Sequence, residues 1–151
     1  LRPLLESIRD AQGGGSLNLI FLLPPFARSR LFTFPLPSSE GEVRGDCHWS
    51  ALNFFNDPPD DRLKDLEYAS ALIREAYYPI GRPSRCGDLV FLLDEAGGVI
   101  HSAVFLADDL VFTKNGINFG QPWILMRMER LLEVYTFSGE PKVLFYRRKE
   151  S

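Results

Sequence analysis

Three short apolar runs separated by turn-forming residues constrain the fold of this chain more than any other feature. They span Leu89 to Leu93, Ile100 to Leu106 and Leu110 to Thr113. Ala96-Gly97-Gly98 separates the first two runs, and Ala107-Asp108-Asp109 separates the last two. Such residues favour tight turns, and a tight turn can join only antiparallel neighbours. The second half of the chain is therefore predicted to form an antiparallel meander.

The first half of the chain carries helical periodicity instead. Trp49, Leu52 and Phe55 follow Asp46 at helical spacing, and a second amphipathic helix is predicted at roughly 61–77. Aspartate is a preferred N-cap residue, because its carboxylate accepts hydrogen bonds from the free amides of the first turn. Helices followed by a meander of strands predict an α+β fold, with N-terminal helices packed on an antiparallel β-sheet.

The remaining elements are predicted from shorter patterns. Further strands are expected at Leu17 to Leu23, Leu31 to Phe34 and Val143 to Tyr146, and further helices at Pro3 to Ala11 and Pro122 to Tyr135. The segment 35–45 is rich in Pro, Ser, Gly and Glu and is expected to be a loop.

Length and composition exclude several classes of protein. The 151 residues, 45% of them hydrophobic and 25% charged, suit one compact soluble domain spanning 1–151. A net charge of −3 gives no electrostatic case for nucleic acid. The longest apolar run, Leu17 to Phe26, is too short for a transmembrane helix, which needs about 20 residues. The two cysteines and two histidines lack the paired short-gap spacing of structural zinc ligands, so neither a metal nor a cofactor is expected.

Cys47 is the candidate nucleophile, because it follows the expected cap residue in the stretch GDCHWSALNFF. A helix N-terminus stabilises a thiolate, and an imidazole would have to take the thiol proton. His48 is adjacent in sequence, but neighbouring side chains on a helix diverge. His101, in a predicted strand, could pack against the helix. The alternative is a structural cysteine, since free cysteines are among the most commonly buried residues.

Three segments, in this order, resemble the NlpC-type cysteine peptidases, papain-like enzymes mostly known for cutting bacterial cell-wall peptides. Asp46-Cys47 resembles the family's Asp-Cys-Ser-Gly at a helix start, and Gly87-Asp88-Leu89-Val90-Phe91 resembles its Gly-Asp-Leu-Val-Phe strand. His101-Ser102-Ala103-Val104-Phe105-Leu106 resembles its His-Val-Gly-Ile-Tyr-Leu strand. The resemblance covers 45–114 and implies a papain-like fold. It leaves 1–37 as an N-terminal extension without a counterpart.

The resemblance implies that Cys47 is the nucleophile and His101 the general base. In the family, a polar residue on the next strand orients the imidazole. Thr113 occupies the corresponding position, and Lys114 and Asn115 beside it are the alternatives.

Asp46, Trp49 and Trp123 are the candidate substrate-binding residues. In the resembling family the matching aspartate helps to hold the free amine of the stem peptide, so Asp46 is expected to combine this role with capping. His48-Trp49 replaces the family's small Ser-Gly, and its bulk is expected to narrow the cleft. Trp123 follows a loop rich in Gly and Asn and is expected to line that cleft.

The resemblance further implies hydrolysis of peptide or amide bonds in bacterial cell-wall stem peptides, and hence an extracytoplasmic location. The papain-like order, cysteine before histidine, favours amide hydrolysis over the lipid acyl transfer of circularly permuted relatives. Two alternatives stay open. One is a non-catalytic papain-like binding domain with a structural cysteine, and the other is an α+β domain with a buried cysteine and no site.

Overall fold

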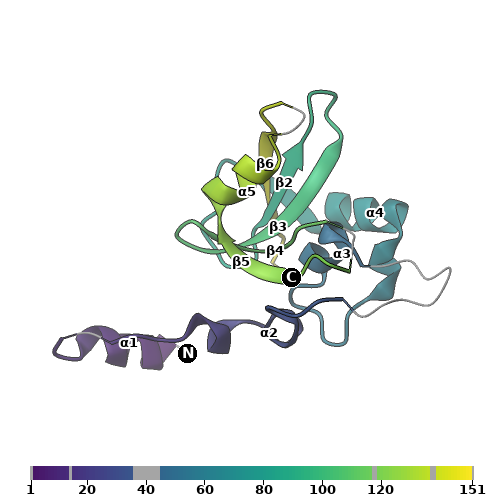
Figure 1. Ribbon diagram of the computed structural model, residues 1–151. Helices are drawn as coiled ribbons and strands as arrows, with labels where there is room; N and C mark the ends of the chain where they lie inside the picture. The colour runs from purple at the N-terminus through teal and green to yellow at the C-terminus, as the bar shows by residue number, and fades with distance from the viewer. Residues whose placement is uncertain (1, 14, 36–44, 117–118, 137–138, 151) are drawn as a thin grey trace.

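A six-stranded antiparallel sheet forms the centre of the computed structural model, which describes residues 2–13, 15–35, 45–116, 119–136 and 139–150. The strand order is β1-β6-β2-β3-β4-β5 (Figure 1). The strands are Tyr77–Ile80 (β1), Leu89–Leu93 (β2), Val99–Ala107 (β3), Leu110–Lys114 (β4), Trp123–Arg127 (β5) and Lys142–Arg148 (β6). The α+β class and the antiparallel meander β2-β3-β4 predicted from the sequence are confirmed.

Short helices cover both faces of this sheet. In chain order they are Arg2–Asp10 (α1), Leu19–Leu22 (η1, a 3-10 helix), Pro25–Arg30 (α2), Cys47–Leu52 (α3), Asp61–Lys64 (η2, a 3-10 helix), Leu66–Ala76 (α4) and Met128–Val134 (α5). Figure 1 shows α1 lying away from the sheet, at the purple end of the chain. Within the described ranges, none of these helices has the length and apolar character needed to cross a membrane.

Alternating residues of β2 separate two hydrophobic clusters, one on each face of the sheet. Leu89 and Phe91 belong to the larger cluster, which contains residues of α2, α3 and α4. Val90 and Leu92 belong to the smaller cluster with Leu131 of α5. Because β2 is buried on both faces, its sequence is a continuous apolar run rather than an alternating one.

Part of the N-terminal extension belongs to the larger cluster. Leu23, Phe26, Ala27 and Leu31 are all buried there. The guanidinium carbon of Arg30 lies 4.0 Å from the centre of the Phe26 ring, a cation–π contact that also shields this part of the core. Residues 23–31 of the extension therefore form part of the hydrophobic core. Most of the expected loop, 36–44, lies outside the described residues.

Two N-terminal strand predictions are wrong. Leu17 to Leu23 contains η1 instead of a strand, and at Leu31 to Phe34 only Leu31 makes an isolated bridge, to Trp123. The prolines expected to end a strand instead begin a helix, α2. Pro25 occupies its first turn, where the fixed φ suits the helix and the missing N–H is not needed.

The two predicted helices in 61–77 and 122–135 are each divided. The side chain of Asp65 caps α4 by accepting a hydrogen bond from the amide of Tyr68 at 2.8 Å, so η2 precedes it as a separate turn. Beyond α4 the chain forms β1, which the sequence did not predict. The first part of 122–135 forms β5, because it pairs with β4, and α5 begins only at Met128.

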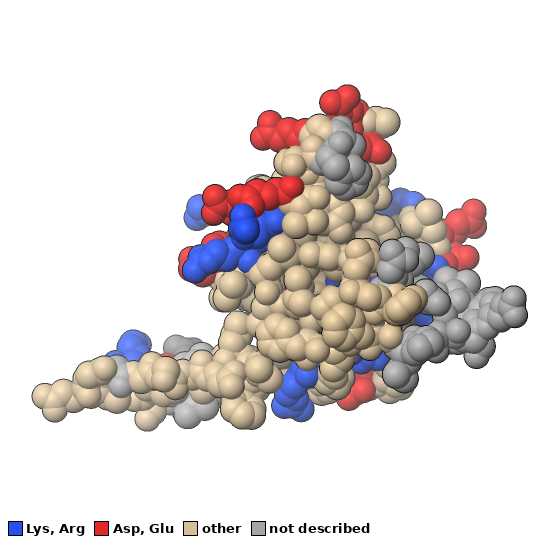
Figure 2. Space-filling view, viewed as in Figure 1, with Lys and Arg blue, Asp and Glu red and all other residues tan. Residues whose placement is uncertain are grey.

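Charged side chains are dispersed over the one face of the molecule that Figure 2 shows. On the face shown in Figure 2, lysine and arginine lie among aspartate and glutamate rather than in a single positive or negative patch. A broad uncharged area lies between them.

Candidate active site

Cys47 is the first residue of α3, and Asp46 is its N-cap. The Asp46 carboxylate accepts a hydrogen bond from the amide of Trp49 at 2.8 Å, as the sequence predicted. The Ser50 hydroxyl donates to the Asp46 carbonyl at 2.7 Å and accepts from the Trp123 indole at 2.9 Å. These bonds fix the start of α3 against β5, and with it the position of the Cys47 side chain.

The Cys47 thiol is protonated at neutral pH in this environment. The residue is only 7% exposed. Burial, and then the negative charge of Asp46, raise the pKa of the Cys47 thiol to about 11, although the backbone amides of Ser102, His48 and Cys47 itself favour the thiolate. A preformed thiolate, which the helix N-terminus led us to expect, is therefore not the resting state.

His101 lies fully buried on β3. Its Nε2 lies 2.7 Å from the Thr113 hydroxyl, and that hydroxyl donates to Asn115 Oδ1 at 3.3 Å. Because a hydroxyl has only one proton, Thr113 must accept from Nε2–H. Nδ1 therefore carries the free electron pair of the neutral ring.

This free electron pair is buried, and no described residue donates a hydrogen bond to it. Among the described residues, His101 Nδ1 is one of two buried side-chain polar atoms that make no hydrogen bond. Burial, with a smaller effect from His48, lowers the pKa of His101 to about 3, so the ring is neutral at pH 7. The neutral imidazole has an unused acceptor, as a general base requires, but a pKa of about 3 makes it a weak base at pH 7.

Cys47 lies close to the backbone of β3, the strand that carries His101, but its thiol is not hydrogen-bonded to the imidazole. The amide of Ser102, adjacent to His101 in the chain, interacts with the Cys47 sulfur. His101 pairs with Leu92 and shares the sheet face that α5 covers. Ser102 faces the α3 side, where its hydroxyl lies 2.6 Å from His48 Nδ1. The structure thus brings the thiol next to the backbone of the histidine, without a direct contact to Nδ1.

Of the three candidates for the orienting residue, Thr113 is the one that contacts the imidazole. Asn115 contacts Thr113 instead of the imidazole. Its amide nitrogen donates to the Met126 sulfur at 3.4 Å, and this bond turns Oδ1 toward Thr113. Lys114 points to the opposite face, where its ammonium group donates to the Gly116 carbonyl and lies 5.7 Å from the Trp123 ring centre.

The expected substrate-binding tryptophans lie in the larger hydrophobic cluster. Trp49 is 7% exposed and meets Phe26 edge-on at 5.3 Å, and Trp123 is 6% exposed. Burial of this extent leaves little indole surface for a substrate. Asp46 is partly exposed, and one of its carboxylate oxygens holds the helix cap.

Two contacts of the site were not predicted from the sequence. One is the bond between His48 and Ser102, which strand alternation could have indicated, since Ser102 must face away from His101. The other is Tyr135, whose ring stacks on His101 with centroids 4.3 Å apart. Nothing local in the sequence signals that stack, because it depends on where α5 crosses the sheet.

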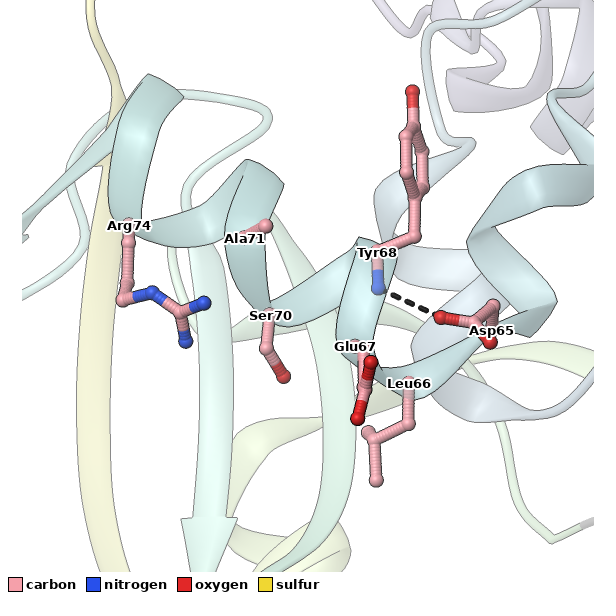
Figure 3. A pocket seen from close by; sticks show the side chains of 7 residues that line it. All are labelled: Asp65, Leu66, Glu67, Tyr68, Ser70, Ala71 and Arg74. Carbon is pink, nitrogen blue, oxygen red and sulfur yellow. Dashed lines mark hydrogen bonds between the residues drawn. The ribbon is translucent and has the colours of Figure 1, made fainter.

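A surface hollow on α4 lies apart from these residues. It has a volume of about 750 Å³ and is lined by Asp65 to Tyr68, Ser70, Ala71 and Arg74 (Figure 3). These side chains project from one helix and its cap, and none belongs to the cysteine and histidine cluster. In the described part of the chain, no group of three or more His, Cys, Asp or Glu side chains is placed to hold a metal ion.

The chain matches no protein-family model, no curated protein and no solved structure. Function must therefore be inferred from the geometry of the site.

Replacing Thr113 with valine should remove the acceptor of the His101 Nε2 proton while keeping the side-chain shape. We expect two effects, a loss of about 1–3 kcal/mol in unfolding free energy and a mixed His101 tautomer, because a buried N–H is left unpaired. Urea unfolding and the nitrogen chemical shifts of the imidazole measure them. Thr113→Ser is the matched control and should retain both properties. A single unchanged tautomer in the valine variant would show that Thr113 does not orient the ring.

Proposed function

We propose that this protein is a papain-like, NlpC-type cysteine hydrolase that cleaves peptide or amide bonds of bacterial cell-wall stem peptides. Cys47 is the nucleophile, His101 the general base and Thr113 the residue that orients the base. The observation that carries the proposal is the buried His101 Nδ1, which has a free electron pair and no hydrogen-bond partner among the described residues, in a ring whose tautomer is determined by Thr113 and Asn115.

The reaction follows from the protonation states of the two groups. As Cys47 Sγ attacks the substrate carbonyl carbon, its proton passes to His101 Nδ1, and the carbonyl oxygen takes up negative charge near the amide of Cys47. The C–N bond then breaks, and the imidazolium returns the proton to the leaving amine. Water, deprotonated by the same nitrogen, hydrolyses the thioester and regenerates the thiol. Because the pKa of the thiol is raised and that of the imidazole is lowered, proton transfer accompanies attack instead of preceding it.

A second function is favoured by the burial of Cys47 and the raised pKa of its thiol. In that alternative the chain is a non-catalytic papain-like domain that binds the same class of peptide. Its Cys47 would behave as an ordinary buried thiol, and the free Nδ1 of His101 would accept a hydrogen bond from the ligand.

An acyloxymethyl ketone built on a stem-peptide fragment separates the two functions, because such a reagent needs both peptide recognition and a base-assisted thiol. We expect mass spectrometry to find the label on Cys47 and not on the exposed Cys86. His101→Gln should prevent labelling without unfolding the protein. Binding of the unreactive peptide without any label on Cys47 would favour the binding domain. Equal, slow labelling of both thiols would contradict the proposed hydrolase.

A further inference from the structure

The Tyr135 ring stacks on one face of the His101 imidazole. Both rings lie on the sheet face that α5 covers, which is the face opposite α3. Tyr135 is the C-cap residue of α5, and its amide bonds to the Leu132 carbonyl at 3.0 Å, which fixes its backbone. The two ring centroids are 4.3 Å apart and the ring planes are inclined by 26°. Tyr135 is partly buried, whereas the imidazole on which it stacks is fully buried.

A single hydrogen bond does not fix an imidazole ring. The bond from Nε2 to Thr113 holds one edge, but the ring can still tilt about that edge. A stacked aromatic ring restricts the tilt, because parallel π-systems lose contact when one of them turns. The direction of Nδ1, on the other edge of the imidazole, is therefore determined by Thr113 and Tyr135 together.

We propose that Tyr135 is a positioning residue, whose ring fixes the tilt of the His101 imidazole and keeps water from it. This inference rests on the proposed hydrolase function. It assigns to α5, which lies outside the 45–114 segment, a part in the active site.

The electrostatic surroundings agree with this placement. Burial, and then a charge on Cys47, raise the pKa of the Tyr135 phenol, so the phenol lies within electrostatic reach of the sulfur. His48, from α3, is the group whose charge acts on His101, while Lys114 of β4 points to the other face of the sheet. A substitution at Tyr135 therefore changes the access of water to the imidazole while leaving His48 and Lys114 in place.

Two variants separate the ring from its hydroxyl. Tyr135→Phe keeps the stack, and Tyr135→Leu keeps an apolar side chain without a ring. We expect Tyr135→Leu to raise the pKa of His101, followed by NMR, by at least about one unit toward its ordinary value, because water then reaches the imidazole. The rate of Cys47 labelling by the peptidyl ketone should fall about tenfold as the base loses its orientation. Tyr135→Phe should retain both values, and so should Val134→Ala at the exposed neighbouring position.

An unchanged pKa of His101 in Tyr135→Leu would overturn the inference. Equal losses in Tyr135→Phe and Tyr135→Leu would also overturn it, since the hydroxyl and not the stacked ring would then be responsible. The pKa measurement needs no substrate. If the wild-type protein fails to label at Cys47, the proposed function fails, whereas the titration of His101 still decides whether Tyr135 sets the state of the imidazole.

Discussion

Cys47→Ala should abolish hydrolysis of stem-peptide fragments, with a loss of at least about 10³-fold in kcat/KM, while the protein stays folded. The sulfur provides the only bond to the acyl intermediate, so no neighbouring group can replace it. The structural cost should be small, about 1 kcal/mol, because the change removes one buried atom and leaves the cap formed by Asp46 intact. Product release measured by liquid chromatography, together with urea unfolding, tests both statements.

The matched control is Cys86→Ala. This second free cysteine is exposed, and its substitution should leave both activity and stability unchanged. Loss of stability with retained activity in Cys47→Ala would assign the residue to the core and end the case for a nucleophile.

If the protein hydrolyses peptides as proposed, the pH profile of the wild type distinguishes general-base catalysis from a preformed ion pair. His101 is the active base only when neutral, and burial lowers its pKa to about 3, so activity should persist well below pH 6 and fall only in strong acid. The pKa of the thiol is raised to about 11, so no alkaline loss from a deprotonating imidazolium is expected at pH 8 to 9. A bell-shaped profile with its alkaline limb in that range would instead show a thiolate–imidazolium pair at rest.

The meander was predictable because its determinants are local. Ala96-Gly97-Gly98 and Asp108 sit at turns that join neighbouring strands, and Asp108 adopts a left-handed φ of 56°, a conformation that aspartate tolerates better than most residues. The face on which Thr113 lies could not be predicted in the same way. A register shift between Phe105 and Ala107 changes the strand alternation through the turn, and only with that shift does Ala103 pair with Thr113.

The errors arose where pairing partners are distant in sequence. An apolar run such as 123–127 fits a helix or a strand equally well, and its contact with β4 decides in favour of β5. The protonation state of Cys47 was mispredicted for a related reason. A helix N-terminus favours a thiolate locally, but burial under elements from elsewhere in the chain outweighs it. Candidate residues could therefore be named from the sequence, whereas their charge states could not.

Asp88→Ala should be the most destabilising single substitution at a polar residue of this sheet. The Asp88 carboxylate is 2% exposed and accepts hydrogen bonds from the amides of Ser84 and Arg85 at 2.8 and 2.9 Å. It also pairs with Arg147 of β6 through two bonds of 2.8 and 2.7 Å. Removing the carboxylate leaves two amides without an acceptor and Arg147 without its counter-ion, although its bond to the Ser84 hydroxyl remains, so we expect a loss of about 3–5 kcal/mol.

The exposed pair of Arg85 and Glu150 provides the control for that loss. Its side chains are 61% and 83% exposed, so Glu150→Ala should cost less than about 1 kcal/mol in the same urea titration. A similar small loss in Asp88→Ala would mean that β2 and β6 are held by packing alone. The Gly87-Asp88 turn would then have no structural role to explain its resemblance to the family motif.

The pH dependence of stability gives an independent test of the same carboxylate. Burial alone would raise the pKa of Asp88, but the Arg147 guanidinium and the two amides outweigh it, so the pKa is lowered overall. Because the folded pKa lies below the unfolded value of about 3.9, this contribution is fully present above that value and is lost as the pH falls through the folded pKa. Asp88→Asn cannot titrate, so its unfolding free energy should decline less steeply than that of the wild type below pH 4. Equal acid slopes for the two proteins would show that Asp88 has the same affinity for protons in the folded and unfolded chains, which the bidentate contact with Arg147 does not allow.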